Sequence, residues 1–303
     1  MKINFTKMHG CGNDYVYIDG GKEKIPQDRK SALAVKISDR HFGIGSDGLI
    51  FINPVDDPDI DFEMEMYNAD GSRSEMCGNG MRCVAKYVYD HRLTDKKNLT
   101  IISAGKKKFI DLTVDDNNLV ERVKVDMGAP ILRASDIPVL IPSSSGSASP
   151  ESDKMGDSSV IGVPITVDGR EYRITCVSMG NPHAVVFLPY DEDLSAFDIE
   201  KIGPMFENHE FFPNRINTEF VKIDDKNNVH MRVWERGSGE TLACGTGCCA
   251  TVTACILNSL TDKKVTVHVL GGDVVCSWDG NESSSVIMEG PATTVFEGVI
   301  DIT

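Results

Sequence analysis

A Cys-Gly-x-Gly segment occurs twice in this chain, and each copy directly precedes a stretch of helically spaced apolar residues. The stretch after Cys77 carries them at i, i+3, i+4 and i+7, as Met81, Val84, Ala85 and Val88. The stretch after Cys244 carries a similar stripe, made of Cys248, Val252, Cys255 and Ile256. This spacing predicts two amphipathic helices, each beginning beside a cysteine.

A second feature repeats at nearly the same offset. Asn13, in GCGNDYVYI, and Asn181, in MGNPHAVVFL, both stand just before an apolar strand. They are separated by almost as many positions as Cys77 and Cys244. The same order of asparagine and Cys-Gly-x-Gly in both halves suggests a duplication, with two similar domains that face each other.

Most other segments have the pattern of short strands. Examples are YVYIDG from Tyr15, GLIFINP from Gly48, VERVKVDMG from Val120 and HAVVFLP from His183. Hairpin turns are expected at Asp168-Gly169 and over 225–228. Two further helices are expected over 29–40 and 199–208, so that sheet is the dominant element.

The composition disfavours several classes of partner. With 46 acidic and 31 basic side chains the formal net charge is −15, which disfavours nucleic acid and anionic membrane surfaces. The sequence shows no signal-peptide pattern and no membrane-spanning apolar run, so a cytoplasmic location is expected. Its nine cysteines are an odd number without repeated pairing, which argues against a disulfide framework.

One segment differs from the rest in composition. Residues 143–159, SSSGSASPESDKMGDSS, are rich in serine and nearly free of apolar side chains. This composition predicts a disordered surface insertion early in the second half of the chain.

The cysteine loops allow several interpretations. The spacings Cys77-x₅-Cys83 and Cys244-x₃-Cys248 do not match a structural zinc site, and no metal is expected. Gly245-x-Gly247-x-x-Ala250 imitates a dinucleotide fingerprint but lacks its βαβ context. Cysteines inside apolar segments are interpreted as core residues, namely Cys83, Cys176, Cys248, Cys249, Cys255 and Cys276.

Cys77 and Cys244 differ because each precedes Gly-x-Gly at a helix N-terminus. Unpaired backbone N–H groups and the positive end of the helix dipole stabilise an anion there, either a thiolate or a substrate carboxylate. One thiolate and one thiol on opposite sides of a carbon could invert it by proton transfer. The hypothesis is a two-base racemase or epimerase acting alpha to a carboxylate.

The chain resembles the diaminopimelate epimerases. The resemblance lies in ordered blocks from one end of the chain to the other: KMHGCGNDYVYID at Lys7, DRHFGIGSDGLI at Asp39, YNADGSRSEMCGNGMRC at Tyr67, MGNPHAVVF at Met179, RINTEF at Arg215 and WERGSGETLACGTG at Trp234. It implies a cofactor-independent isomerase that interconverts LL- and meso-diaminopimelate, on the route to lysine and peptidoglycan.

The resemblance also implies an α/β (α+β) fold of two pseudo-symmetric domains. Each would be a mainly antiparallel sheet wrapped around a central helix, with the active site in the cleft between the domains. The N-terminal domain is expected over 1–130, completed by a strand at 291–303, and the C-terminal domain over 131–290. The expected partner is the small-molecule substrate, and a homodimer is left open.

Site residues follow from the same likeness, motif by motif. Cys77 and Cys244 would be the acid and base, and His183 and Glu235 would tune their protonation. The helix-start residues that would hold the reacting carboxylate are Gly78, Asn79, Gly245 and Thr246. The residues that would line the substrate pocket are Asn13, Asn68, Asn181, Asn217, Glu235 and Arg236.

Some features depart from the family pattern or favour a rival. Gly48 follows GIGSD, where some members carry a glutamine that contacts substrate, so that contact would be absent or made by backbone or water. A redox role for Cys248 and Cys249 stays open. The rival functions are a proline-racemase-like enzyme of the same two-thiol type, and a non-catalytic metal or redox module.

Overall fold

A computed structural model describes residues 1–74, 77–141 and 158–302 of the chain. The chain forms two compact units: unit 1 comprises Met1–Asp126 and Glu289–Thr303, and unit 2 comprises Met127–Met288. All but the last two residues of the predicted insertion at 143–159 lie outside the described residues.

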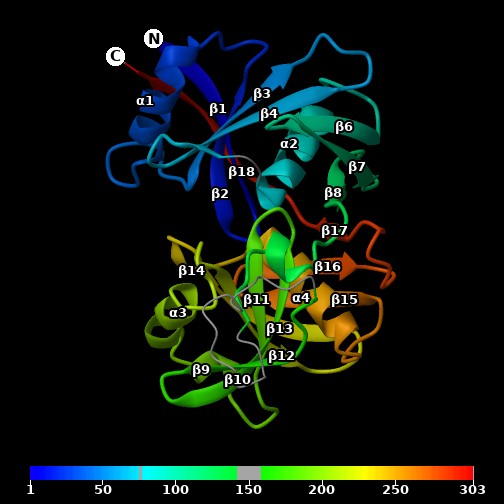
Figure 1. The fold of residues 1–303 in the computed structure, drawn as a ribbon. Helices are drawn as coiled ribbons and strands as arrows, with labels where there is room; N and C mark the ends of the chain where they lie inside the picture. The colour runs from blue at the N-terminus through cyan, green and yellow to red at the C-terminus, as the bar shows by residue number, and fades with distance from the viewer. Residues whose placement is uncertain (75–76, 142–157, 303) are drawn as a thin grey trace. The chain divides into compact units, whose positions relative to one another are not determined.

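Unit 1 is a mixed sheet with two helices (Figure 1). Its elements in chain order are β1 (Lys2–Gly10), β2 (Asn13–Asp19), α1 (Gln27–Ser38), β3 (Gly48–Pro54), β4 (Phe62–Asn68), β5 (Arg73–Ser74), α2 (Gly78–Asp90), β6 (Asn98–Ser103), β7 (Lys106–Val114), β8 (Val120–Asp126) and β18 (Thr293–Asp301). β2 is parallel to β3, and β4 is parallel to β6. The other recorded pairs are antiparallel, namely β1 with β2 and β18, β3 with β4, β4 with β5, β6 with β7 and β7 with β8.

Unit 2 has a closely similar set of elements. They are η1 (Ala134–Asp136), β9 (Val163–Val167), β10 (Arg170–Ser178), β11 (Pro182–Phe187), η2 (Leu194–Ala196), α3 (Ile199–Glu207), β12 (Asn217–Ile223), β13 (Asn228–Glu235), β14 (Gly239–Thr241), α4 (Gly245–Leu257), β15 (Lys264–Val269) and β16 (Gly272–Ser277). β17 (Ile287–Gly290) begins in unit 2 and ends in unit 1. β11 is parallel to β12 and β13 to β15, whereas β9–β10, β10–β11, β12–β13, β13–β14 and β15–β16 are antiparallel.

The two units repeat one topology. In each, an antiparallel pair of strands is followed by a helix and by a strand that is parallel to the second strand of the pair. That strand forms an antiparallel hairpin with the next one. A very short strand, a second helix and a strand parallel to the second hairpin strand then follow. β1 to β7 thus correspond to β10 to β16, and α1 and α2 to α3 and α4. The predicted duplication into two pseudo-symmetric, mainly antiparallel domains is confirmed.

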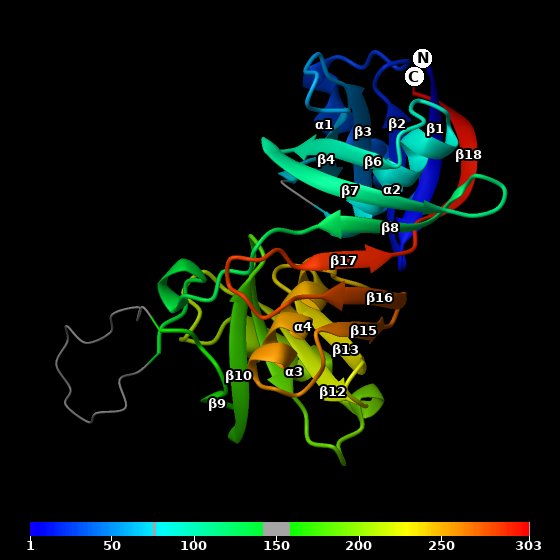
Figure 2. The ribbon, with the colours of Figure 1, turned by 90° about the vertical axis from the view of Figure 1, so that its right-hand side faces the viewer.

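The helices that follow the Cys-Gly-x-Gly segments are the buried centres of their units. α2 packs against β1, β2, β7 and β8, and α4 packs against β10, β11, β12, β15 and β16. Figure 2, a view at right angles to Figure 1, shows α2 among the strands of its unit. The predicted stripe of α2 is fully buried. A helix surrounded by a sheet must be apolar on most of its faces, as the sequence of α4 is.

The remaining helices cover the outer faces of the sheets. Leu33, Ala34 and Ile37 of α1 join the core with Val16 and Ile18 of β2. α3 packs on β9, β12, β13 and β14. Both helices lie where the spacing of apolar residues predicts them, within a few residues at each end. No helix in the described part of the chain is long and apolar enough to cross a membrane.

The predicted hairpin turns are present. Val167 pairs with Arg170, so Asp168-Gly169 forms a two-residue turn with φ of 51° and 73°. Such turns require positive φ at both central residues, which aspartate and glycine tolerate. The turn expected over 225–228 is also present, since residues 224–227 join β12 to β13.

Candidate active site

Cys77 is the N-cap of α2. Its backbone is extended, with φ −132° and ψ 115°, and its Sγ accepts a hydrogen bond from the backbone N–H of Gly80 at 3.3 Å. A Cβ on Gly80 would lie 2.8 Å from Cδ1 of Ile50 and 3.6 Å from that sulfur. Glycine therefore lets the first turn of α2 approach both β3 and the thiol, which keeps the sulfur at the positive end of the helix.

Asn13 of the predicted pocket and Asn79 of the helix start are hydrogen-bonded to each other beside the Cys77 thiol. Oδ1 of Asn13 accepts hydrogen bonds from Sγ of Cys77 at 3.2 Å and from Nδ2 of Asn79 at 3.4 Å. The fully buried Arg82 donates from Nη2 to Oδ1 of Asn79 at 2.9 Å. The start of β2 and the first turn of α2 are thus joined around the sulfur.

Asp47 orients Asn13, and the sequence analysis did not single it out. Its Oδ2 accepts hydrogen bonds from Nδ2 of Asn13 at 2.8 Å and from the backbone N–H of Asp14 at 3.0 Å. Arg40 bridges to Oδ1 of Asp47 at 2.9 Å. Asp47 belongs to the block DRHFGIGSDGLI, which contains Arg40 as well, but nothing local to that block points to Asn13.

Asn68 ends β4 opposite Gly48, the first residue of β3. Nδ2 of Asn68 donates to Oγ of Ser72 at 2.9 Å. A Cβ at position 48 would lie 2.2 Å from the carbonyl oxygen of Tyr67 and 2.9 Å from Cε1 of Tyr15. The backbone thus has no room for any other residue at position 48 without a local shift, a physical reason for the glycine there.

Cys244 occupies the equivalent position in unit 2, as the N-cap of α4. It has φ −118° and ψ 109° and is 6% exposed. Its Sγ lies 3.5 Å from Oγ1 of Thr246. A Cβ on Gly247 would lie 3.4 Å from that sulfur and 2.7 Å from Oε1 of Glu219, so the glycine is again needed for a close approach.

Cys244 lies in an environment that favours the thiol. Burial raises its pKa well above the usual range, and the carboxylates of Glu235 and Glu219 act in the same direction. Burial also raises the pKa of Glu235, against the hydrogen bond that Oγ1 of Thr241 donates to it. Because Cys244 and Glu235 interact with each other, these two groups titrate together rather than independently.

His183 lies in the same unit and is fully buried. Its Nδ1 is 2.6 Å from Oε1 of Glu219, and its Nε2 is 3.1 Å from Oδ1 of Asn181. The parallel pairing of β11 with β12 places His183 beside Asn217 and Val185 beside Glu219. Glu219 was missed by the sequence analysis, although it lies within the quoted block RINTEF.

Asn217 and Arg236 form a second hydrogen-bonded group in unit 2. Oδ1 of Asn217 accepts from the backbone N–H of Arg236 at 2.9 Å, and its Nδ2 donates to the carbonyl of Pro182 at 2.8 Å. Arg236 itself is exposed and donates from Nη1 to the carbonyl of Asn214 at 3.0 Å. Asn217 therefore connects the segment after β13 to the start of β11.

The structure assembles the predicted residues within each unit. In unit 1, Asn13, Cys77 and Asn79 are hydrogen-bonded together, Gly78 opens the same helix, and Asn68 lies at the end of β4. In unit 2, Cys244, Glu235 and Thr246 meet at the start of α4, which Gly245 opens, and Asn181 and His183 form one hydrogen-bonded group.

The cysteines assigned to the core are buried as expected. Cys83, Cys176, Cys248, Cys249, Cys255 and Cys276 are at most 1% exposed. The sulfurs of Cys249 and Cys276 lie 3.8 Å apart. Burial raises the pKa of Cys83 to about 11 and that of Cys255 to about 12, which keeps both as thiols at neutral pH.

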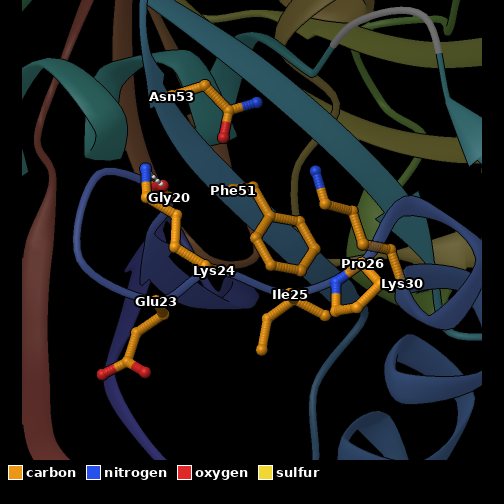
Figure 3. A pocket seen from close by; sticks show the side chains of 8 residues that line it. All are labelled: Gly20, Glu23, Lys24, Ile25, Pro26, Lys30, Phe51 and Asn53. Carbon is orange, nitrogen blue, oxygen red and sulfur yellow. Dashed lines mark hydrogen bonds between the residues drawn. The ribbon is translucent and has the colours of Figure 1, made fainter.

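Unit 1 also has a pocket that is lined by none of the predicted site residues (Figure 3). Its volume is about 250 Å³, and it is lined by Gly20, Glu23, Lys24, Ile25, Pro26, Lys30, Phe51 and Asn53. Lys30 is ion-paired with Glu65, and its ammonium lies 4.5 Å from the centre of the Phe51 ring. Within 1–74, 77–141 and 158–302, no group of three or more His, Cys, Asp or Glu could hold a metal ion.

The sequence of this chain is similar to those of known proteins. A family model described as diaminopimelate epimerase matches residues 5–132 and 175–295. A diaminopimelate epimerase of Agathobacter rectalis is 56% identical over 99% of this chain and 100% of its own. A diaminopimelate epimerase of Methanococcus maripaludis is 50% identical over 99% of this chain and 100% of its own.

Solved structures with far lower identity share the fold. A PhzF-family phenazine biosynthesis protein of Bacillus anthracis has a TM-score of 0.66 at 17% identity, over 100% of both chains. A hydroxyproline epimerase of Agrobacterium vitis has a TM-score of 0.64 at 13% identity, over 99% of this chain and 91% of its own. At these identities the likeness concerns the fold alone.

Proposed function

Because the chain belongs to the diaminopimelate epimerase family, we propose that Cys77 and Cys244 are the acid and base of its reaction. The enzyme interconverts LL- and meso-diaminopimelate, a step of lysine biosynthesis. One observation supports the assignment above the others: each cysteine caps the buried central helix at the equivalent point of a duplicated fold.

Inversion of the alpha carbon needs two groups, since a proton leaves one face and another arrives at the opposite face. The proposal therefore requires the two sulfurs to approach one carbon from opposite sides. The thiolate of one cysteine abstracts the alpha proton while the thiol of the other donates its own. After one turnover the first cysteine is the thiol and the second is the thiolate, which is the state that the reverse reaction needs, and no cofactor takes part.

The substrate carboxylate is assigned to the helix starts. Removing the alpha proton moves negative charge onto the carboxylate, and the backbone N–H groups at Gly78, Asn79, Gly245 and Thr246 are suited to receive it. A single well-placed donor of this kind is worth about 3 kcal/mol in a transition state. The first turns of α2 and α4 thus provide both the cysteine and the groups that stabilise the carbanion.

The polar side chains of the predicted pocket bind the substrate. Asn13, Asn68, Asn181 and Asn217 offer amides, and Glu235 and Arg236 offer a carboxylate and a guanidinium. A substrate with an ammonium and a carboxylate at both ends requires this mixture of donors and acceptors. His183 and Glu235 are assigned to tune the protonation of Cys244, since Glu235 raises the pKa of Cys244 and the charge of His183 lowers the pKa of Glu235.

Incubation with LL-diaminopimelate in D₂O, without added cofactor, tests the proposal. We expect meso-diaminopimelate with deuterium at the inverted alpha carbon, detected by NMR and mass spectrometry. Proline and trans-4-hydroxyproline serve as comparison substrates, and preferred turnover of either would favour the proline-racemase-like alternative. Product that forms without deuterium would contradict proton exchange with a thiol.

A homodimer and a cytoplasmic location are further proposals. β18 exposes Val295, Phe296 and Val299, each between 46% and 59%, and an apolar strand of this kind is suited to pair with a second copy. Val299→Glu should shift the sedimentation of a dimer to that of a monomer, and identical sedimentation of both proteins would contradict pairing through this strand.

The proposed cytoplasmic location is supported by the cysteines. Cys83, Cys176 and Cys255 are free thiols, as is usual in a reducing compartment.

A further inference from the structure

A fully buried carboxylate adjoins the start of α4, and none of the roles above uses it. Glu219 of β12 has no solvent exposure. A Cβ on Gly247 would lie 2.7 Å from its Oε1 and 3.4 Å from Sγ of Cys244. The carboxylate and the sulfur therefore flank the same backbone position in the first turn of α4.

Glu219 also holds His183 in one orientation. Nδ1 of His183 lies 2.6 Å from Oε1 of Glu219, and its Nε2 lies 3.1 Å from Oδ1 of Asn181. Both ring nitrogens thus face oxygen acceptors, and both bonds form together when each nitrogen carries a proton. The contact with the carboxylate fixes the plane of the ring, so that Nε2 points at the amide of Asn181.

The chain of contacts continues into the predicted pocket. With its Oδ1 engaged by His183, Asn181 presents Nδ2 as the amide atom that can donate to a ligand. Rotating the amide by half a turn would instead place Nδ2 against Nε2 of His183. Glu219 therefore fixes, through one intermediate ring, the position of the nitrogen that the amide of Asn181 contacts.

One oxygen of the Glu219 carboxylate lacks the hydrogen bond that a purely structural buried carboxylate would be expected to have. Oε2 of Glu219 is buried and has no hydrogen-bond partner among the residues that the structure describes. Burying such an oxygen opposes folding by about 1–3 kcal/mol or more. Buried carboxylates with such an unsatisfied oxygen concentrate at functional sites, where they alter the protonation of a neighbour.

We propose that Glu219 is a positioning residue of the epimerisation: it orients Asn181 through His183, and its charge at the start of α4 holds Cys244 as the thiol. The inference rests on the proposed roles of Cys244 and Asn181. It adds a carboxylate from β12 to Glu235, which comes from β13. The two act together, because a thiolate beside two carboxylates is strongly disfavoured.

A test must separate the effect of Glu219 on Cys244 from the effects of the other titratable groups nearby. Glu235 and Glu219 both raise the pKa of Cys244, after burial itself. His183 faces Glu219, and its charge lowers the pKa of Glu235. Cys176 of β10, whose own pKa is raised by burial and by Glu219, is a thiol throughout. Changing Glu219 alone therefore leaves Glu235 and His183 to act on the sulfur.

Glu219→Gln tests the charge, because glutamine retains an acceptor for Nδ1 of His183. The readout is alkylation of Cys244 by iodoacetamide as the pH is raised, followed by mass spectrometry of its peptide. We expect the midpoint to fall by about 1 pH unit, equal to about tenfold faster alkylation at a fixed pH below it. Glu207→Gln removes another buried carboxylate of unit 2 and should retain the wild-type midpoint.

Glu219→Leu tests the orientation of Asn181, because it removes the acceptor as well as the charge. The KM for diaminopimelate should rise by about tenfold over that of Glu219→Gln, the effect of one misplaced hydrogen bond. If circular dichroism shows that Glu219→Leu is unfolded, Glu219→Asp replaces it. This variant keeps the charge but withdraws it from His183, so KM should rise while alkylation stays near wild type.

An unchanged alkylation midpoint in Glu219→Gln overturns the charge role, and an unchanged KM in the second variant overturns the positioning role. The KM reading needs an active wild-type enzyme, whereas the alkylation midpoint does not. Absence of epimerisation by wild-type protein would instead contradict the proposed function, and the alkylation midpoints would still report on Glu219 and Cys244 alone.

Discussion

The backbone N–H of Gly80 donates to Sγ of Cys77 at 3.3 Å, within the first turn of α2. This bond places the sulfur where the helix dipole and the unpaired amides favour negative charge. The same turn would hold the carboxylate of the substrate. In the proposed mechanism one helix start thus brings a proton-transfer group and a charge-stabilising group to the same point, and the duplicated fold has two such helix starts.

Replacing either cysteine by alanine should remove epimerisation. Cys77→Ala or Cys244→Ala takes away one of two proton-transfer groups, so kcat should fall by at least about 100-fold. The measurement is conversion of LL- to meso-diaminopimelate by chiral chromatography. Cys255→Ala, which changes a buried thiol further along α4, serves as the control and should keep most of the activity. Near-normal turnover by either of the first two variants would refute the two-base mechanism.

Gly48→Ala should destabilise unit 1. The added Cβ would meet the carbonyl oxygen of Tyr67 at 2.2 Å, so β3 and β4 must separate locally. Overpacking of this kind lowers the free energy of unfolding by about 1–3 kcal/mol, measured by urea denaturation. Gly105→Asn is a matched control, because position 105 has open space around it and a φ of 78° that asparagine tolerates. Equal stability of both variants would contradict the close approach.

Lys30→Met should be strongly destabilising. Lys30 and Glu65 form a nearly buried ion pair between α1 and β4. Removing one partner of such a pair leaves the other charge buried and lowers the free energy of unfolding by about 3–5 kcal/mol. The double variant Lys30→Met with Glu65→Leu should recover much of that loss. A single variant as stable as wild type would show that other groups satisfy Glu65.

The carboxylate of Glu65 also makes the stability of the protein depend on pH in the acid range. Burial raises the pKa of Glu65, but hydrogen bonds from Lys30 and its other neighbours outweigh this and lower it to about 2. The ionised form is thus favoured by the fold, and its contribution is complete above the ordinary value of 4.5. It is lost as the pH falls from there towards about 2, and in Lys30→Met this loss should be smaller.

Alkaline pH should destabilise the protein through its buried thiols. The pKa of Cys83 is about 11 and that of Cys255 about 12, against an ordinary value of 9.0. Above about pH 9 the unfolded chain releases protons that the folded chain retains. Each thiol then lowers the free energy of unfolding by about 1.4 kcal/mol per pH unit, up to its folded pKa.

Urea denaturation under reducing conditions, at about pH 8 and about pH 10, measures this effect. The variant with Cys83→Ala and Cys255→Ala should show a shallower decline between the two conditions, although it is less stable at the lower one. A free energy of unfolding that does not change with pH in wild type would contradict the burial of these thiols.

The sequence by itself determined the elements and the class of chemistry. The stripe from Met81 to Val88 specifies a buried helix, and Asp168-Gly169 specifies a tight hairpin, because periodicity and turn preference are encoded over a few adjacent residues. The repeated order of asparagine and Cys-Gly-x-Gly also indicated the duplication. The cysteines were separated into core residues and helix-start residues by the same local patterns.

Only the tertiary structure decided which side chains meet. Cys77 contacts Asn13 across 64 positions, and His183 contacts Glu219 across 36. These partners are brought together by strand order and register, which no local pattern specifies. Glu219 and Asp47 each look like one more acidic residue in the sequence. Burial and proximity give each a distinct role, because the effect of a carboxylate depends on its distance from other charges and from water.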